Sequence, residues 1–381
     1  MQEITVEREI GGRMFQMETG KVAKLASAAV VVRYAESALL GSCVRANPRP
    51  GIDFFPLQCD YREKLSAGGK FPGGFRKREG PPSEKEILTM RNMDRPIRPL
   101  FPEGFIDEVQ IQAWVMSHDG QNDTDVLACN AASAALVLSD APFEGPVATV
   151  RIGRIITDDG EQFVLNPTHA QLEYSDVDLL VSGHSDGINM IEVGAAEITE
   201  DDLLKALQFA YEDGVKPLLE LQMELVEKCG GRKVHVGELV LPPDDIVEIV
   251  RDACEAELTE ARQIKAKQER SEAVAAIRDR MLEAHFPIKE DGTYGEYRES
   301  DRRFNQAKEA FRSLEKKVTQ RLIREEGIRA DGRGFKEIRD LHMEVGNFPG
   351  MHGSALFQRG ETQSIVSCTL ATSRDEQIVD G

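Results

Sequence analysis

Alternating apolar and polar positions dominate the first half of the chain and predict a β-rich domain. Runs of β-forming residues at 3–10, 13–18, 28–33 and 39–45, separated by Gly11-Gly12 and Gly20, indicate a β-meander. Further strands are predicted at residues 53–64, 108–117, 147–156, 161–165, 178–182 and 189–193. The small-residue-rich stretch 124–139 predicts a helix that packs closely against a sheet. Strands with a few helices on one face favour an α+β domain, which we place at residues 1–198.

The pattern changes after Ile198, where helix-forming and charged residues dominate. Apolar residues at helical spacing predict a helix from Leu203 to Leu225 that stops at Gly230-Gly231. Pro242-Pro243 opens a second helical stretch, unbroken or broken, that reaches His285, and a third covers 300–324. Heptads are not sustained, so we expect an all-α domain at residues 199–323 rather than a coiled coil.

An internal repeat links the two ends of the chain. A shift of 326 residues places 17–46 over 343–372 without a gap. Identical residues at this shift include Met17 and Met343, Glu18 and Glu344, Gly20 and Gly346, Ala29 and Ala355, and Arg33 and Arg359. Shared strand patterning alone is the alternative, but the matching glycine and arginine favour duplication. Residues 324–381 are therefore expected to begin a second copy, which stops at Gly381 before a complete domain.

Composition narrows the functional classes. The chain has 381 residues and a formal net charge of −19, so any nucleic-acid contact must be a local basic surface on an acidic protein. Six scattered cysteines without a CxxC pair indicate reduced thiols. The seven histidines show no zinc-ligand spacing, so no metal site is expected. The N-terminus lacks the order of a secretory signal, and no apolar run approaches the ~18 residues of a membrane span, so a soluble, cytoplasmic protein is expected.

Candidate chemistry is concentrated at residues 71–105. A turn at Gly73-Gly74 places Phe75 beside three consecutive cations, Arg76, Lys77 and Arg78. Arginine binds phosphates in a bidentate manner and an aromatic ring stacks on a base, so this composition favours a phosphodiester chain as ligand.

The helix that follows extends the basic surface. Ser83 and Glu86 have the spacing of a capping box, and the helix is expected to run to about Asp94 and to stop before Pro96. Helical spacing aligns three more arginines on one side, Arg91, Arg95 and Arg98. The alternative is a solvated charged face, with these arginines paired to Glu84, Glu86 and Asp94.

The strings FRKREG, PPSEKEILTMR and DRPIRPLFPEGF resemble the first ribonuclease-PH-type domain of the bacterial polynucleotide phosphorylase family. REEGIRADGRGF and HGSALFQRGETQ, near the second copy, are also similar to that family. The resemblance implies a ribonuclease-PH-like domain of ribosomal-protein-type β-α-β-α fold, an all-α domain and an incomplete second core domain. It also implies 3′-to-5′ phosphorolytic degradation of single-stranded RNA to nucleoside diphosphates, with inorganic phosphate as co-substrate and Mg²⁺ as cofactor. A homotrimer, RNA-degradation complex partners and a cytoplasmic location follow from it as well.

The resemblance places the catalytic residues of the family in the second core domain, beyond Gly381. In the first copy, the counterpart of the family's serine loop is 120–124, which has no serine. Asp178 keeps one carboxylate, while Leu180 and Leu172 stand at the family's lysine and second acidic positions. The first domain is therefore expected to be catalytically silent. Two alternatives stay open, a non-catalytic RNA-threading scaffold and a hydrolytic exosome-type subunit.

The resemblance also implies an RNA-guiding role for the basic stretch. In the family, the loop that matches 74–78 constricts the central pore of a trimeric ring and carries two phenylalanines, whereas this chain has one. The RNA-binding residues expected on this basis are Phe75, Arg76, Lys77, Arg78, Arg91, Arg95 and Arg98. For Arg98, a structural role through a salt bridge is an equally good interpretation.

Overall fold

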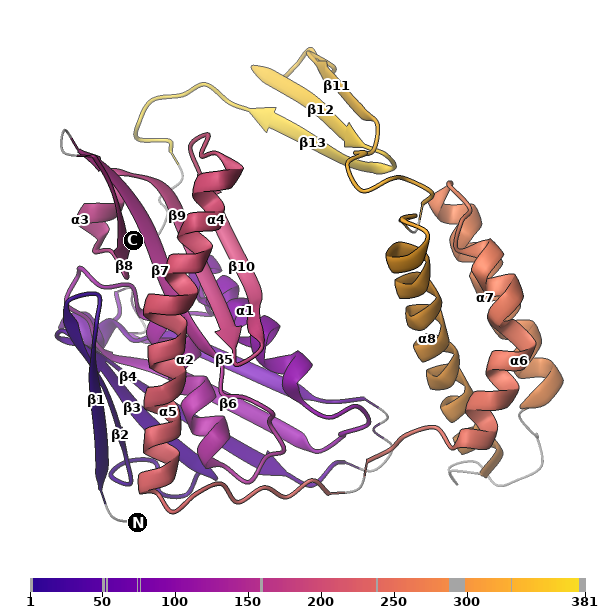
Figure 1. Cartoon of the computed structure of the whole chain (residues 1–381). Helices are drawn as coiled ribbons and strands as arrows, with labels where there is room; N and C mark the ends of the chain where they lie inside the picture. Colours follow the sequence, from indigo (N-terminus) through magenta and orange to yellow (C-terminus); the bar gives the residue numbers. More distant parts are fainter. Residues whose placement is uncertain are drawn as a thin grey trace. The chain divides into compact units, whose positions relative to one another are not determined.

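A computed structural model of the chain describes residues 3–49, 52, 54–73, 75, 77–157, 160–237, 239–287, 299–329 and 331–376. It contains two compact units, Met1–Val240 and Leu241–Gly381, and each is described by itself below (Figure 1).

The first unit contains a six-stranded sheet in the order β1-β2-β3-β4-β6-β5. Neighbouring strands are antiparallel except β5 and β6, which run parallel. The strands are β1 (Ile4–Ile10), β2 (Arg13–Thr19), β3 (Ala28–Tyr34), β4 (Ser37–Ala46), β5 (Leu57–Glu63) and β6 (Glu108–Ser117). The predicted meander is confirmed. The strand expected from residue 53 begins only at Leu57, directly after Pro56, which has no N–H to donate to a ladder.

A second sheet of four antiparallel strands has the order β10-β9-β7-β8. Its strands are β7 (Ala148–Thr157), β8 (Gly160–Leu165), β9 (Ser175–His184) and β10 (Gly187–Ala195), with the short helix α3 (His169–Leu172) before β9. All four strands coincide with runs that the sequence predicted. The presence of largely antiparallel sheets together with helices confirms the expected α+β class.

Helix α2 (Thr124–Leu138) lies between the two sheets and contacts β3, β4 and β7. It is buried on every side, since each residue from Thr124 to Val137 is buried. The many alanines of this helix allow a close approach to the sheet. Where Gly41 on β4 faces α2, an added Cβ would lie 2.7 Å from the Cβ of Ala131.

Helices α4 (Glu200–Phe209) and α5 (Lys216–Lys228) join through a π-helical segment, Ala210–Val215. Apolar residues of α5 belong to the same hydrophobic core as the two sheets. The first unit consequently extends to Val240, whereas the sequence placed a domain boundary at residue 198. Helical periodicity predicted these helices, but a local pattern does not show against which hydrophobic core a helix packs. The predicted glycine stop is present, because the Gly231 N–H donates to the Val226 carbonyl at 3.0 Å.

Helix α1 (Glu84–Ile97) continues through Pro96, so the prediction that it ends before this proline was wrong. Proline removes a single hydrogen bond in the last turn, and the N–H of Arg98 still donates to the Asp94 carbonyl. Pro96 and Ile97 are both buried, which stabilises the helical continuation. A 3₁₀ turn, Arg98–Leu100, leads onward from the helix.

In the second unit, three helices confirm the expected helical tract: α6 (Asp244–Ala261), α7 (Lys267–His285) and α8 (Glu299–Glu325). Buried residues of α6 recur every four positions at Ile246, Val250, Cys254 and Leu258. They form a separate hydrophobic core with side chains of α7 and α8. The predicted stretch from Pro242 to His285 is broken between α6 and α7.

The second unit also contains a three-stranded sheet, β11 (Leu341–Val345), β12 (Gly353–Arg359) and β13 (Thr362–Cys368), in the order β11-β12-β13. It repeats the antiparallel arrangement of β2, β3 and β4. The register corrects the gapless alignment, because Met17 pairs with Val32 while Met343 pairs with Phe357. The shift of 326 therefore holds for β11, whereas β12 and β13 match their counterparts at 325. One residue is absent from the connection before β12, and Gly360 stands where Ala35 does, each with positive φ.

The close approach of α2 to β4 yields a test. Gly41→Ala is expected to lower the free energy of unfolding by about 1–3 kcal/mol, because the new methyl group overlaps Ala131 in a packed interior. Gly194→Ala is the matched control, since a Cβ on this strand glycine meets no atom within 4 Å. Urea unfolding measures both variants, and equal midpoints would contradict the proposed close packing.

Candidate nucleic-acid interface

The connection between β5 and α1 is fixed at its base by hydrogen bonds and ion pairs. The Nζ of Lys64 lies 2.7 Å from a carboxylate oxygen of Glu79, and the N–H of Leu65 donates to the same carboxylate at 3.2 Å. The guanidinium of Arg62 donates to the Gly80 carbonyl at 3.0 Å. The Lys64 ammonium lowers the pKa of Glu79. The residues that follow Gly69 thus extend from a base that these contacts close.

Glu86 links this base to helix α1. Its carboxylate accepts from the N–H of Ser83 at 2.6 Å, which completes the predicted capping box, and from the N–H of Glu63 on β5 at 2.8 Å. A guanidinium nitrogen of Arg62 lies 3.2 Å away. Glu86 is 5% exposed, so one buried carboxylate sets both the start of α1 and its position against β5.

The tip of the connection is exposed. Phe75 is 102% exposed, and Lys77 and Arg78 are also exposed. Within the described part of the chain, neither Lys77 nor Arg78 has a carboxylate partner, and the Nζ of Lys77 lies 5.1 Å from the centroid of the Phe71 ring. Lys77 has a φ of +48°, a backbone conformation that side-chain-bearing residues rarely adopt. Gly74 and Arg76 lie outside the described residues.

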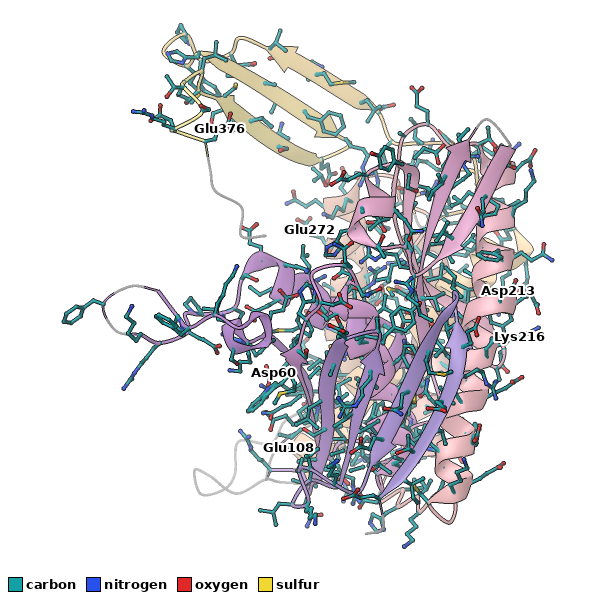
Figure 2. All side chains as sticks on the ribbon, turned by 90° about the vertical axis from the view of Figure 1, so that its left-hand side faces the viewer. Asp60, Glu108, Asp213, Lys216, Glu272 and Glu376 are labelled. Carbon is teal, nitrogen blue, oxygen red and sulfur yellow. The ribbon has the colours of Figure 1, made fainter. Side chains whose placement is uncertain are left out.

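Figure 2 shows this connection reaching away from the body of the first unit. Asp60 on β5 lies on the side from which the connection extends, whereas Asp213 and Lys216 lie on the opposite side (Figure 2). The fixed base and the projecting tip give a surface where an aromatic ring and two cations are presented to solvent together.

The three arginines after the connection have different environments. Arg91 is exposed and has no ion pair to a described residue. Arg95 is paired with Glu192 on β10. Arg98 binds the Asp94 carboxylate at 2.5 Å and donates to the Leu57 carbonyl at 3.2 Å, so its guanidinium holds α1 against the start of β5. The contacts of Arg98 therefore fit the alternative of a structural salt bridge. Of the three arginines, Arg91 alone could bind a ligand without first losing an ion pair to a described residue.

The counterpart of the expected catalytic site contains an arginine that the sequence did not single out. Arg151 on β7 donates to both carboxylate oxygens of Asp178 at 2.5 and 2.7 Å. The same guanidinium also binds Asp125 and lies 3.4 Å from Asp123, at the start of α2. The remaining cavity beside it measures about 10 Å³, roughly the size of one water molecule and too small for phosphate.

Burial and charge together shift the pKa values of this cluster. Burial and the neighbouring Asp123 raise the pKa of Asp125 to about 6, against the opposing effect of Arg151. Burial also acts to raise the pKa of Asp123, but the charges of Arg151 and Lys85 bring it below its ordinary value. Burial acts to lower the pKa of Arg151, but the three carboxylates together raise it above its ordinary value, so the guanidinium stays charged. Arg151 is thus the counter-charge that allows two acidic groups to start a buried helix.

The described residues hold no group of three or more His, Cys, Asp or Glu side chains arranged to bind a metal ion. Within that same part of the chain, no helix is both long enough and apolar enough to span a membrane.

Comparison with known proteins agrees with this architecture. Residues 11–142 match a family model described as 3′ exoribonuclease family, domain 1, and residues 145–213 match domain 2 of that family. Both matches fall within the first unit, which is therefore a 3′-exoribonuclease-type domain pair. Residues 245–334 match a model described as polyribonucleotide nucleotidyltransferase, RNA binding domain.

Curated relatives named polyribonucleotide nucleotidyltransferase are similar along almost the whole chain. The protein from Rhodopirellula baltica is 46% identical over 100% of this chain and 49% of its own length. Those from Thermus thermophilus and Bacillus pumilus are 44% and 43% identical over 98% and 97% of this chain, and 51% and 50% of their own lengths. The chain belongs to the polyribonucleotide nucleotidyltransferase family, and it spans about half the length of the curated relatives it matches.

Removal of the internal counter-charge yields a pH-dependent prediction. Arg151→Met is expected to lower the free energy of unfolding at pH 8 by about 3–5 kcal/mol, because buried carboxylates lose their partner. Without Arg151, the pKa of Asp125 rises further above its unfolded value, so the folded state binds the proton preferentially. Stability is then present at low pH and lost as the pH rises through the folded pKa, so the deficit relative to wild type should shrink at pH 5.

Arg33→Met is the control for this substitution, because Arg33 is a strand arginine that is 45% exposed in its ion pair with Glu18. Its effect should stay within about 0.5 kcal/mol at either pH. Urea unfolding at pH 5 and pH 8 measures both variants. A deficit for Arg151→Met that does not change with pH would contradict the assigned carboxylate cluster.

Proposed function

We propose that this chain supplies the RNA-guiding part of a phosphorolytic 3′-to-5′ exoribonuclease, which moves nucleotides from the 3′ end of RNA onto inorganic phosphate and releases nucleoside diphosphates. Single-stranded RNA is the partner of the exposed connection between β5 and α1. Family membership and the names of the curated relatives support the reaction class. A homotrimeric assembly, partners in RNA degradation and a cytoplasmic location are part of the same proposal and rest on the resemblance alone.

The observation that carries the RNA-guiding role is the exposed tip of that connection. Phe75 offers a ring for stacking on a base, and Lys77 and Arg78 offer charges without carboxylate partners in the described chain. From its place in the sequence, we propose that Arg76 also contacts RNA at this tip. We further propose that Arg91 on α1 contacts a phosphate. Arg95 and Arg98 are weaker candidates, because RNA would have to displace Glu192 or Asp94.

Neutralising the tip is the direct test. The triple variant Arg76→Ala, Lys77→Ala, Arg78→Ala should bind a labelled 20-nucleotide oligo(A) RNA about tenfold more weakly at 0.1 M salt. The slope of log affinity against log salt should fall by roughly two, since each phosphate contact on a single strand contributes about 0.7. Fluorescence anisotropy across a salt series measures both quantities.

A second triple variant controls for the loss of net charge. Lys21→Ala, Lys24→Ala and Lys233→Ala remove three exposed cations elsewhere in the first unit and should leave both the affinity and the slope near wild type. If the tip variant binds RNA as tightly as this control, the connection is not in the RNA path.

We place Mg²⁺ and inorganic phosphate in the second core domain, of which this chain contributes β11, β12 and β13. The counterpart in the first unit does not suit either ligand. Asp178 is bonded to Arg151, and the space beside that guanidinium has room for about one water molecule. These contacts support the expectation that the first unit is catalytically silent, so that the chain alone acts as an RNA-threading scaffold.

A product assay separates the possible activities. When the 381-residue chain is incubated with oligo(A) RNA, Mg²⁺ and phosphate, no ADP should form, because the cavity beside Arg151 is too small for phosphate. Thin-layer or anion-exchange chromatography of the products, with a parallel reaction lacking phosphate, makes the measurement. Release of ADP would assign catalysis to the first unit, and release of AMP without phosphate would favour the hydrolytic exosome-type alternative.

A further inference from the structure

The second unit contains a larger cavity than any space around Arg151. Its volume is about 360 Å³, within the size range of ligand-binding pockets. Three segments far apart in the sequence line it: the link from α6 into α7, the residues before β11, and the turn between β12 and β13. Its walls carry six cationic side chains, Lys265, Lys267, Arg270, Arg333, Arg339 and Arg359.

The lining keeps an excess of positive charge in an acidic chain. Four carboxylates face the six cations, so the cavity is a local basic site in a protein of net charge −19. Asp331 is already engaged, since Arg333 lies 2.7 Å and Arg339 3.3 Å from one of its oxygens. The Arg333 guanidinium lowers the pKa of Asp331 to about 2, so this carboxylate remains ionised at neutral pH.

The other cations have no carboxylate partner among the described residues. Arg270 donates to the carbonyls of Ile264 and Lys265 at 2.8 and 3.1 Å, which orients its guanidinium without neutralising it. The side chains of Lys265, Lys267 and Arg359 have no ion pair to the described chain. Charged side chains gathered without partners around one cavity are suited to an anionic ligand.

Two glycines let the long side chains lie close to the backbone. A Cβ added to Gly332 would lie 3.5 Å from the Cγ of Lys265, and one added to Gly360 would lie 2.9 Å from the Cδ of Arg339. Both glycines have positive φ, a conformation that side-chain-bearing residues rarely adopt. The N–H of Lys267 donates to the carboxylate of Glu361 at 3.2 Å, which joins the start of α7 to the β12–β13 turn. Two walls of the cavity are therefore held together without a ligand.

We propose that this basic pocket, defined by the six cations named above, binds the phosphate groups of single-stranded RNA. The proposal rests on the RNA-related function proposed above and identifies a second place where this chain contacts RNA. The match to the RNA binding domain model ends at residue 334 and so includes Lys265, Lys267, Arg270 and Arg333, whereas Arg339 and Arg359 come from the segment beyond it.

The chemistry of the lining favours the RNA backbone over its bases. Among the described residues that line the cavity, Ile338 is the one large apolar side chain, and none is an aromatic residue that could stack on a base. Contact through phosphates alone gives binding that is independent of sequence and strongly dependent on salt. Oligo(A) and oligo(U) of equal length should accordingly depend on the basic pocket to the same extent.

A charge-neutralising variant tests the basic pocket. Lys265→Gln, Lys267→Gln and Arg359→Gln should weaken the binding of a labelled 20-nucleotide oligo(A) RNA to the 381-residue chain about tenfold at 0.1 M salt. The salt slope should fall by roughly two, because about three phosphate contacts are lost. The matched control is Lys316→Gln, Lys317→Gln and Arg324→Gln, which removes three exposed cations of α8 outside the cavity and should leave binding near wild type. Equal affinities for the two variants would overturn the proposal.

Backbone hydrogen exchange on the unmodified chain gives a readout that does not depend on the variants folding. Oligo(A) RNA should slow exchange in peptides covering 265–270 and 359–362, while 10 mM inorganic phosphate or ADP should not reproduce the protection. Absence of protection by RNA would overturn the proposal, and protection by phosphate or ADP alone would assign the pocket to a small anion instead. The tip variant described above distinguishes the two RNA contacts: if it alone weakens binding, the proposed function stands and the basic pocket fails.

Discussion

The complete burial of helix α2 is the constraint on which the first unit depends. A helix buried on all sides must pack closely against both sheets, and here its alanines and Gly41 on β4 allow that approach. Burial also removes the first turn of the helix from water, with Asp125 buried and Asp123 partly buried beside it. Two carboxylates cannot remain ionised there without cations. Arg151 on β7 contacts both from the facing sheet, and Lys85 on α1 lies 3.4 Å from Asp123.

The same requirement explains why the space left beside Arg151 is too small for a phosphate. A site for an anion or a metal needs carboxylates and space that the fold leaves free. Arg151 uses its second edge to bind Asp178, so the one acidic residue retained at the expected position is already neutralised. The arginine that compensates the buried carboxylates of α2 thereby also binds Asp178, the residue at the expected catalytic position. The contacts that compensate the burial of α2 thus leave a space of only about 10 Å³ beside Arg151.

Local patterns predicted the helices and strands well because periodicity is a property of neighbouring residues, as the four-residue spacing in α6 illustrates. These local patterns could not predict contacts between residues that are distant in the sequence. The pairing of Arg95 with Glu192 and the cluster around Arg151 bring together strands and helices that the sequence does not relate to one another. The nearness of Phe75 to the cations Lys77 and Arg78 follows from the sequence itself, whereas the register of the repeat does not. A one-residue difference in a connecting loop leaves the alternation of apolar residues almost unchanged, although it moves the hairpin turn.

Net charge makes the position of each unpaired cation decisive for RNA binding. RNA is a polyanion and this chain carries a net charge of −19, so the net electrostatic force between them is repulsive. At 0.1 M salt, charges act over about 10 Å, and only cations close to the phosphate can offset that repulsion. A cation already bound to a carboxylate, such as Arg98, contributes little to this attraction. Lys77 and Arg78 at the exposed tip, and Lys265 and Lys267 in the basic pocket, have no carboxylate partner in the described chain. These four cations are therefore the ones that we propose as contacts for the RNA phosphates, the first two in one unit and the last two in the other.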